Sequence, residues 1–228
     1  MDDALLVLLL TAAACAPLGV FLILRRLSMM ADAISHTVLL GIVLAFFVTH
    51  DLGSPWLLFG AALMGVVTVS LVELLGKTRL VKYDDAIGVI FPLLFALAVI
   101  LISKYAGNAH LDTDMVLMGE VIYAGLNTVG IGGVEIPAAA LKMGGLALLI
   151  AVFITVFYKE LKFSAFDGEY ARLIGVPTGI LFYAFMSLTS LTTVAAFDAV
   201  GAILVISFFI APGAAALLFT KHLSHTLL

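Results

Sequence analysis

The sequence has a single cysteine, Cys15, and few charged residues. One thiol excludes an intramolecular disulfide and any metal site made of several thiolates. Charged residues make up 11% of the chain, whereas soluble domains have about a quarter. The formal net charge of −4 excludes the basic surface typical of nucleic-acid-binding proteins, so no nucleic-acid partner is expected.

Apolar residues take the place of the missing charges. They make up 64% of the sequence, and the mean hydropathy is +1.24. A soluble protein of this composition would expose too much apolar surface, which excludes a soluble enzyme and indicates that membrane lipid surrounds most of the chain. The long unbroken apolar runs favour helices over the alternating strands of a β-barrel.

Seven segments have the length and composition of transmembrane helices, which need about 20 mainly apolar residues. We therefore predict an all-α integral membrane protein, a polytopic helical bundle in one transmembrane domain over residues 1–228. The fifth segment is short and has room to extend back towards Ala138. The predicted spans are approximately Ala4–Leu24, Met30–Val48, Pro55–Leu75, Ala86–Ser103, Met143–Tyr158, Thr178–Ala195 and Val200–Phe219.

The distribution of basic residues predicts the orientation. The first span follows an acidic flank, Met1-Asp2-Asp3, and is therefore a retained helix rather than a signal peptide. With the N-terminus outside, only Lys104 and Lys142 face the exterior, and the other nine of the 11 Lys and Arg residues face the cytoplasm. These nine are Arg25, Arg26, Lys77, Arg79, Lys82, Lys159, Lys162, Arg172 and Lys221.

Local patterns refine this picture. The stretch Met115–Leu126 is apolar and predicts a short interfacial or re-entrant helix that ends before the glycines of 130–133. Small residues four apart, such as Gly41 with Ala45, favour close helix approach. Glu73 lies four residues before Lys77, which predicts an ion pair on one helix.

Nucleotide-binding motifs are absent. Gly76-Lys77-Thr78 resembles the end of a phosphate-binding loop, but Leu71 stands where that motif requires glycine. We find no set of nucleophile, base and orienting group either. The chain is therefore not expected to be an enzyme, and any ATP hydrolysis must take place on a separate chain.

Two ionisable residues lie inside the second predicted span. Asp32 and His36 are four residues apart, which stacks their side chains on one face of a helix. Ionisable groups within a span usually face the bundle interior or a water path. Three interpretations are open: a structural hydrogen bond between helices, a proton relay, and a pair of ligands for a first-row divalent metal ion on a transport path. Ser35 is expected to be a packing hydroxyl.

A short cytoplasmic helix is predicted within residues 166–177. Asp167 is a favourable N-cap, Gly175 suits the position after a helix end, and Pro177 prevents continuation. A helix of about two turns is unstable alone, so it needs a surface to pack against. It is either a loop helix on the membrane surface or a docking element for a cytoplasmic partner.

Several of these segments together resemble the membrane permease subunits of manganese, zinc and iron ABC importers, the ABC-3 family. The resemblance runs from about Ala16 to the last residue. It is carried by Pro17–His36, Asp85–Gly88, Phe166–Ala171 with Gly175, and Ala199–Pro212.

The resemblance implies an ABC importer permease of the prokaryotic inner membrane. Such permeases form a homo- or heterodimer of membrane subunits, bind two cytoplasmic ATPases, and receive the ion from an extracytoplasmic solute-binding protein. The Asp-Ala-x-Ser-His motif maps onto Asp32 and His36 as metal ligands. No permanent cofactor is implied, only a transported divalent ion. The coupling helix that meets the ATPase maps onto Phe166, Asp167, Glu169, Tyr170, Ala171, Leu173, Ile174 and Gly175.

Two departures from the family pattern stand out. Family members usually continue past Leu228 with one or two more spans, so the chain is either truncated or a short member. Leu117–Glu120 and Tyr158–Lys162 look closer to the manganese and iron branch than to the zinc branch. Manganese is therefore the first expectation for the ion.

The alternative function is an ion-coupled secondary transporter or channel that uses Asp32 and His36 as a relay.

Overall fold

The computed structural model describes residues 2–51, 54, 56–78, 80–105, 128–131, 134–220 and 223–227. Seven of its helices are long and apolar enough to cross a membrane, which confirms the prediction of a seven-span helical protein. They are α1 (Asp2–Leu24), α2 (Met29–Thr49), α3 (Trp56–Lys77), α4 (Tyr83–Tyr105), α6 (Ala138–Val156), α9 (Thr178–Val200) and α10 (Ala202–Phe219).

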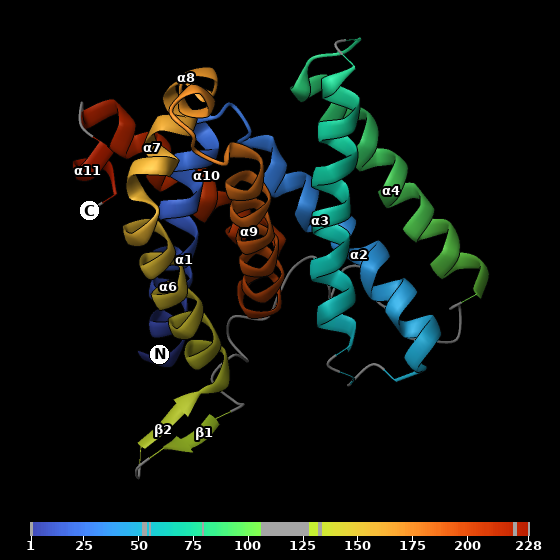
Figure 1. Ribbon diagram of the computed structural model, residues 1–228. Coiled ribbons are helices and arrows are strands. Elements are labelled where there is room, and N and C mark those ends of the chain that lie inside the picture. Colours follow the sequence, from blue (N-terminus) through green and yellow to red (C-terminus); the bar gives the residue numbers. More distant parts are fainter. Residues whose placement is uncertain are drawn as a thin grey trace.

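Short elements lie at both ends of this bundle (Figure 1). The helices α7 (Tyr158–Phe166), α8 (Gly168–Leu173) and α11 (Leu223–Thr226) lie at one end, the same end as the α3–α4 connection. The strands β1 (Thr128–Ile131) and β2 (Val134–Pro137) form an antiparallel pair at the other end, with Ile131 opposite Val134.

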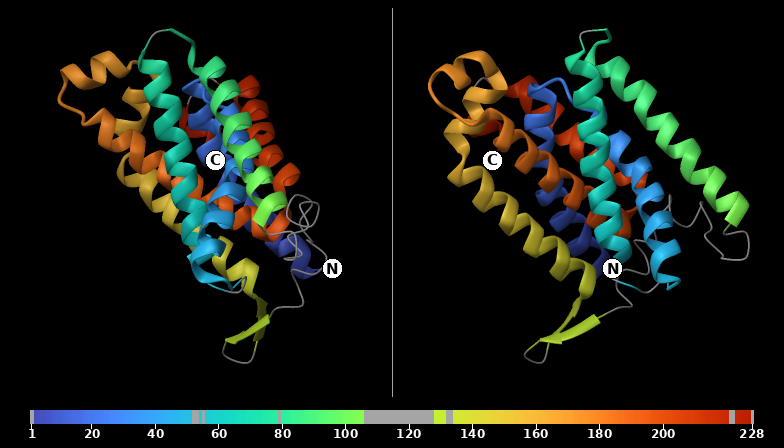
Figure 2. Two further views of the ribbon diagram at one scale, coloured as in Figure 1. Left: turned by 90° about the vertical axis from the view of Figure 1, so that its right-hand side faces the viewer. Right: turned by 45° about the vertical axis from the view of Figure 1, so that its right-hand side comes forward.

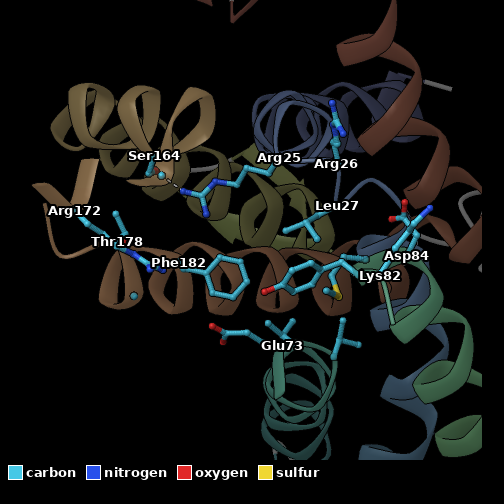
Figure 3. Close-up of a pocket in the computed structure, with 16 residues that line it drawn as sticks. Arg25, Arg26, Leu27, Glu73, Lys82, Asp84, Ser164, Arg172, Thr178 and Phe182 are labelled. Atoms are coloured by element: carbon cyan, nitrogen blue, oxygen red, sulfur yellow. Dashed lines mark hydrogen bonds between the residues drawn. The ribbon is translucent and has the colours of Figure 1, made fainter. Parts of the chain in front are cut away.

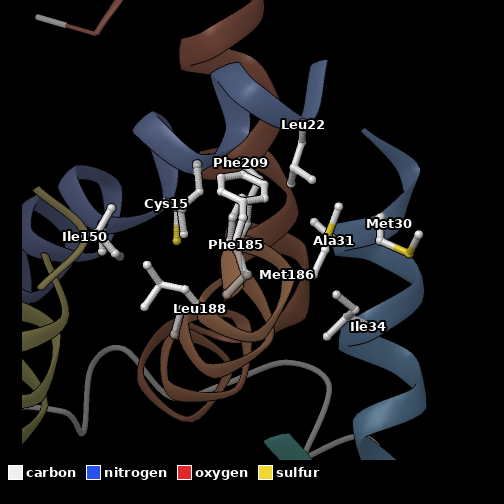
Figure 4. Close-up of a cluster of buried hydrophobic side chains, with 14 of the residues drawn as sticks. Cys15, Leu22, Met30, Ala31, Ile34, Ile150, Phe185, Met186, Leu188 and Phe209 are labelled. Carbon is white, nitrogen blue, oxygen red and sulfur yellow. The ribbon is translucent and has the colours of Figure 1, made fainter. Parts of the chain in front are cut away.

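Helix α9 lies in the middle of the bundle and contacts α1, α2, α3, α6 and α10 (Figures 1 and 2). Its fully buried side chains Phe185 and Met186 form part of the main core with Leu22 and Cys15 of α1 and Phe209 of α10 (Figure 4). By contrast, α4 packs along the outside against α2 and α3, and much of its surface is exposed apolar side chain.

Glycines allow the closest helix crossings. A Cβ at Gly19 of α1 would lie 1.7 Å from the backbone oxygen of Phe209 in α10, so only glycine fits there. Helices α2 and α3 cross in the same way. A Cβ at Gly41 would lie 2.4 Å from the oxygen of Gly60, and Gly60 in turn faces Ala45. The expected role of the Gly41 and Ala45 spacing is therefore confirmed.

Buried hydroxyl groups join the central helices. Thr68 Oγ1 of α3 lies 2.8 Å from Thr37 Oγ1 of α2. Ser190 Oγ of α9 donates to the backbone oxygen of Ala62 in α3 at 3.0 Å. Because these hydroxyls are satisfied, they stabilise the packing without leaving an unpaired polar group in the apolar interior.

The structure differs from the sequence-based predictions in several places. The strands β1 and β2 and the short helices α7 and α11 were not predicted. The sixth span continues to Val200 rather than Ala195, and the single residue Gly201, with φ +82°, joins it to α10. Only glycine readily adopts that conformation, which allows so short a connection. The interfacial helix predicted over Met115–Leu126 lies outside the described residues.

Candidate metal and coupling sites

The structure brings Asp32 and His36 together on α2. His36 Nε2 lies 3.4 Å from Asp32 Oδ1, and the side chains are 25% and 28% exposed, respectively. Their spacing of four residues places them one turn apart on the same face, as predicted. The pair lies in the first half of α2, towards the end of the bundle that carries the α1–α2 turn.

Aromatic side chains of α4 surround the imidazole. The centroid of the His36 ring lies 5.1 Å from that of Phe91 and 5.7 Å from that of Phe95. His36 Nδ1 is buried and has no hydrogen-bond partner among the described residues. An imidazole with one nitrogen next to a carboxylate, and the other without a hydrogen-bond partner among the described residues, offers the nitrogen donor that metal ions commonly bind.

Neighbouring polar residues have structural roles. Ser35 Oγ donates to the backbone oxygen of Asp32 at 2.7 Å, so it packs within α2 as expected. Lys77 Nζ lies 2.7 Å from Glu73 Oε1, which confirms the predicted ion pair. Within the described ranges, no group of three or more His, Cys, Asp and Glu side chains is arranged to hold a metal ion. Within that part of the chain, Asp32 and His36 are therefore a pair of candidate ligands, without a third such side chain arranged beside them.

A second candidate site is the segment predicted to meet an ATPase. Asp167 caps α8, since its Oδ1 accepts from the backbone N–H of Glu169 at 3.1 Å and of Tyr170 at 2.9 Å. Gly175, at φ +87°, follows the helix end. The helix thus has the N-cap and C-terminal glycine that the sequence predicts.

The side chains of α8 divide into an anchored and an exposed set. Ala171 is fully buried, and Tyr170 contacts the ring of Phe163 in α7 at a centroid distance of 6.2 Å. Phe166 and Leu173, by contrast, are 65% and 86% exposed. Together with the half-exposed Tyr170 and Ile174, Phe166 at the end of α7 and Leu173 of α8 present an exposed apolar edge. Such an edge at the end of the bundle is suited to pack against a partner.

Helix α7, which the sequence analysis did not predict, packs against α8. Leu161 is fully buried and anchors α7, and the Arg25 guanidinium donates to Ser164 Oγ from the α1–α2 turn. The sequence of α7 mixes apolar residues with three charged residues, which is a weak signal for a separate helix. Its low hydrophobicity separated it from the span before it.

The model of the ABC 3 transport family matches residues 1–228. The chain belongs to this family. It is 47% identical over 220 residues to the manganese transport system membrane protein MntD of Bacillus subtilis, covering 96% of this chain and 74% of MntD. It is 46% identical over 210 residues to the zinc transport system membrane protein TroD of Treponema pallidum, covering 92% of this chain and 57% of TroD.

Solved structures agree with this assignment. The fold resembles a chain of PsaBC from Streptococcus pneumoniae in complex with Fab, with a TM-score of 0.76, 29% identity, and coverage of 99% of this chain and 75% of that chain. The family and the seven candidate spans make this a multi-pass protein of the prokaryotic cell membrane and a transport subunit of the ABC type.

Proposed function

We propose that the chain is the permease subunit of an ATP-driven importer for a divalent transition-metal ion, with manganese first and zinc or iron as alternatives. The observation that carries this proposal is the Asp32–His36 pair, 3.4 Å apart within a span of an ABC 3 family member. Relatives named for manganese, zinc and chelated iron transport support the ion class.

The chemistry of the pair fits such cargo. A carboxylate supplies a negative charge and an imidazole supplies a nitrogen donor, a combination that first-row divalent ions accept. The ion is the substrate, and it binds during passage. Because the described residues offer two candidate ligands, we propose that water, another helix or a second permease subunit supplies the remainder.

The proposal includes three kinds of partner. A second permease subunit, in a homo- or heterodimer, would complete the membrane part. Two cytoplasmic ABC ATPases would bind beneath it and contact the apolar edge of α8, and an extracytoplasmic solute-binding protein would deliver the ion. The exposed Leu173 on the short, anchored helix α8 supports an ATPase contact. An apolar side chain that faces water does not stabilise a short helix, whereas one covered by a partner does.

The second candidate function is a secondary transporter or channel in which the pair relays ions or protons. It is favoured by the single Asp–His contact, which is suited to a relay. It leaves α8 without a role, because a secondary transporter has no ATPase to contact.

The deciding experiment is uptake of radioactive manganese by liposomes that contain the permease, with the solute-binding protein outside and the ATPase at the other face. The importer predicts uptake that requires ATP and continues when a protonophore collapses the proton gradient. Uptake that needs no ATPase and stops with the protonophore would support the secondary transporter instead. Zinc and iron in the same assay would rank the ions.

A further inference from the structure

A cavity of about 590 Å³ is lined in part by α8, at the end of the bundle that carries most of the basic residues (Figure 3). Its wall is formed by the α1–α2 turn, the ends of α3 and α8, and the starts of α4 and α9. It is distinct from the Asp32–His36 pair, although Met30, two residues before Asp32, lines it.

Positive charge dominates the wall of this cavity. Arg25, Arg26, Lys82 and Arg172 line it, together with the carboxylates Glu73 and Asp84. Glu73 forms an ion pair with Lys77 at 2.7 Å and also interacts electrostatically with Arg172, so it offsets part of this positive charge. The four cationic residues come from three segments far apart in the sequence, so the tertiary fold gathers them at one place.

Arg25 is the most enclosed of these cations. Its guanidinium donates to Ser164 Oγ and lies 5.7 Å from the ring centroids of both Phe182 and Phe185. Its Nε is buried without a hydrogen-bond partner among the described residues. Burial lowers the pKa of Arg25 to about 10, so the group stays charged at neutral pH.

These contacts leave the charge of Arg25 uncompensated. Cation–π contacts and a neutral hydroxyl offset part of its desolvation, but a buried charge is ordinarily paired with an opposite charge. In the part of the chain that the structure describes, no carboxylate forms an ion pair with Arg25, Arg26, Lys82 or Arg172. Arg172 Nε instead donates to Thr178 Oγ1 at 3.0 Å, which holds its guanidinium at the cavity wall.

We propose that this cavity binds a phosphate group, carried either by an anionic lipid of the cytoplasmic leaflet or by a soluble phosphate. Guanidinium groups bind phosphate oxygens in a two-pronged geometry, and Arg25 and Arg172 supply two of them. Leu27, Val69 and Val72 add an apolar part to the wall, which suits the glycerol and upper acyl region of a lipid. A bound phosphate would link the α1–α2 turn to α8. The binding of phosphate is independent of the proposed function, whereas the importance of this link rests on it.

The test is the thermal stability of the purified permease in an uncharged detergent at constant ionic strength. The probes are sodium phosphate, dioctanoyl phosphatidylglycerol, and dioctanoyl phosphatidylcholine, whose headgroup has no net charge. The proposal predicts a saturable rise in Tm with phosphate or with phosphatidylglycerol, and not with phosphatidylcholine. A rise with phosphate alone identifies a soluble ligand, and a rise with phosphatidylglycerol alone identifies a lipid.

Variants locate the binding. The double variant Lys82→Gln with Arg172→Gln changes exposed side chains and should raise the half-saturating concentration at least about tenfold. Lys162→Gln removes an exposed charge at the same end outside the cavity and should leave it unchanged. Arg25→Lys, which keeps the charge, should weaken binding less than Arg25→Gln. No rise with either anion, or equal effects of the double variant and Lys162→Gln, would overturn the proposal. Because no transport is measured, this outcome is independent of the proposed function.

Discussion

His36 Nε2 lies 3.4 Å from Asp32 Oδ1, one helical turn apart on α2 and beside the rings of Phe91 and Phe95 on α4. If the two are metal ligands, Asp32→Asn and His36→Ala should each lower manganese uptake more than about tenfold, because no third His, Cys, Asp or Glu of the described ranges is arranged with them to replace a lost ligand. Uptake is measured in vesicles at equal permease abundance.

The matched control for this pair is Ser35→Ala. It removes a hydroxyl from the adjacent position, where Ser35 is buried and bonds only within α2. Its uptake should stay near wild type. Wild-type uptake by either Asp32→Asn or His36→Ala would show that the pair has a structural role.

The second prediction concerns orientation. In a Cys15→Ala background, a cysteine at Asp51 should react with an impermeant thiol reagent added outside intact cells, and one at Leu80 should not. Both positions are exposed and lie at opposite ends of the bundle, after α2 and after α3. The reason is the concentration of basic residues at the Leu80 end. The reverse labelling would place α8 outside the cell and remove it from any ATPase.

The third prediction concerns the crossing of α1 and α10. Gly19→Ala should destabilise the protein by more than about 2 kcal/mol, because its Cβ would overlap the backbone oxygen of Phe209, which cannot move without shifting α10. Gly145→Ala is the control, since a Cβ there meets nothing within 4 Å and favours the helix. Thermal unfolding in detergent compares them. Equal Tm values for the two variants would show that α1 and α10 do not pack this closely.

Hydropathy was sufficient to predict the spans but not the elements between them. The seven runs are apolar because lipid surrounds them, and their ends differ from the structure by at most five residues, the largest differences being the start of α6 at Ala138 and the end of α9 at Val200. The pairing of β1 with β2 had a signal in the two β-branched runs on either side of Gly132-Gly133. Helix α7 had almost no signal in the sequence, because it carries too much charge and is too short to be a span.

The local chemistry of the candidate sites was also predictable, whereas their surroundings were not. Helical spacing was sufficient to pair Asp32 with His36 and Glu73 with Lys77, and capping preference identified Asp167. The contact of His36 with Phe91 depends on how α4 packs against α2. No local pattern determines that packing. The cavity that joins Arg25 with Arg172 likewise depends on how segments far apart in the sequence pack together.

The last prediction tests whether α8 contacts the ATPase. Tyr170→Asp with Leu173→Asp should abolish co-purification of the ATPase and its metal-stimulated activity, because an unpaired carboxylate buried in that contact costs several kcal/mol and weakens binding by orders of magnitude. Both side chains lie on the exposed edge of α8, so folding and membrane insertion should be retained. Leu80→Asp, at an 84% exposed position of the same end, is the matched control and should bind normally. A pull-down and an ATP hydrolysis assay measure the effect. Normal ATPase binding by the double variant would show that α8 is a loop helix on the membrane surface, and the secondary-transporter hypothesis would gain support.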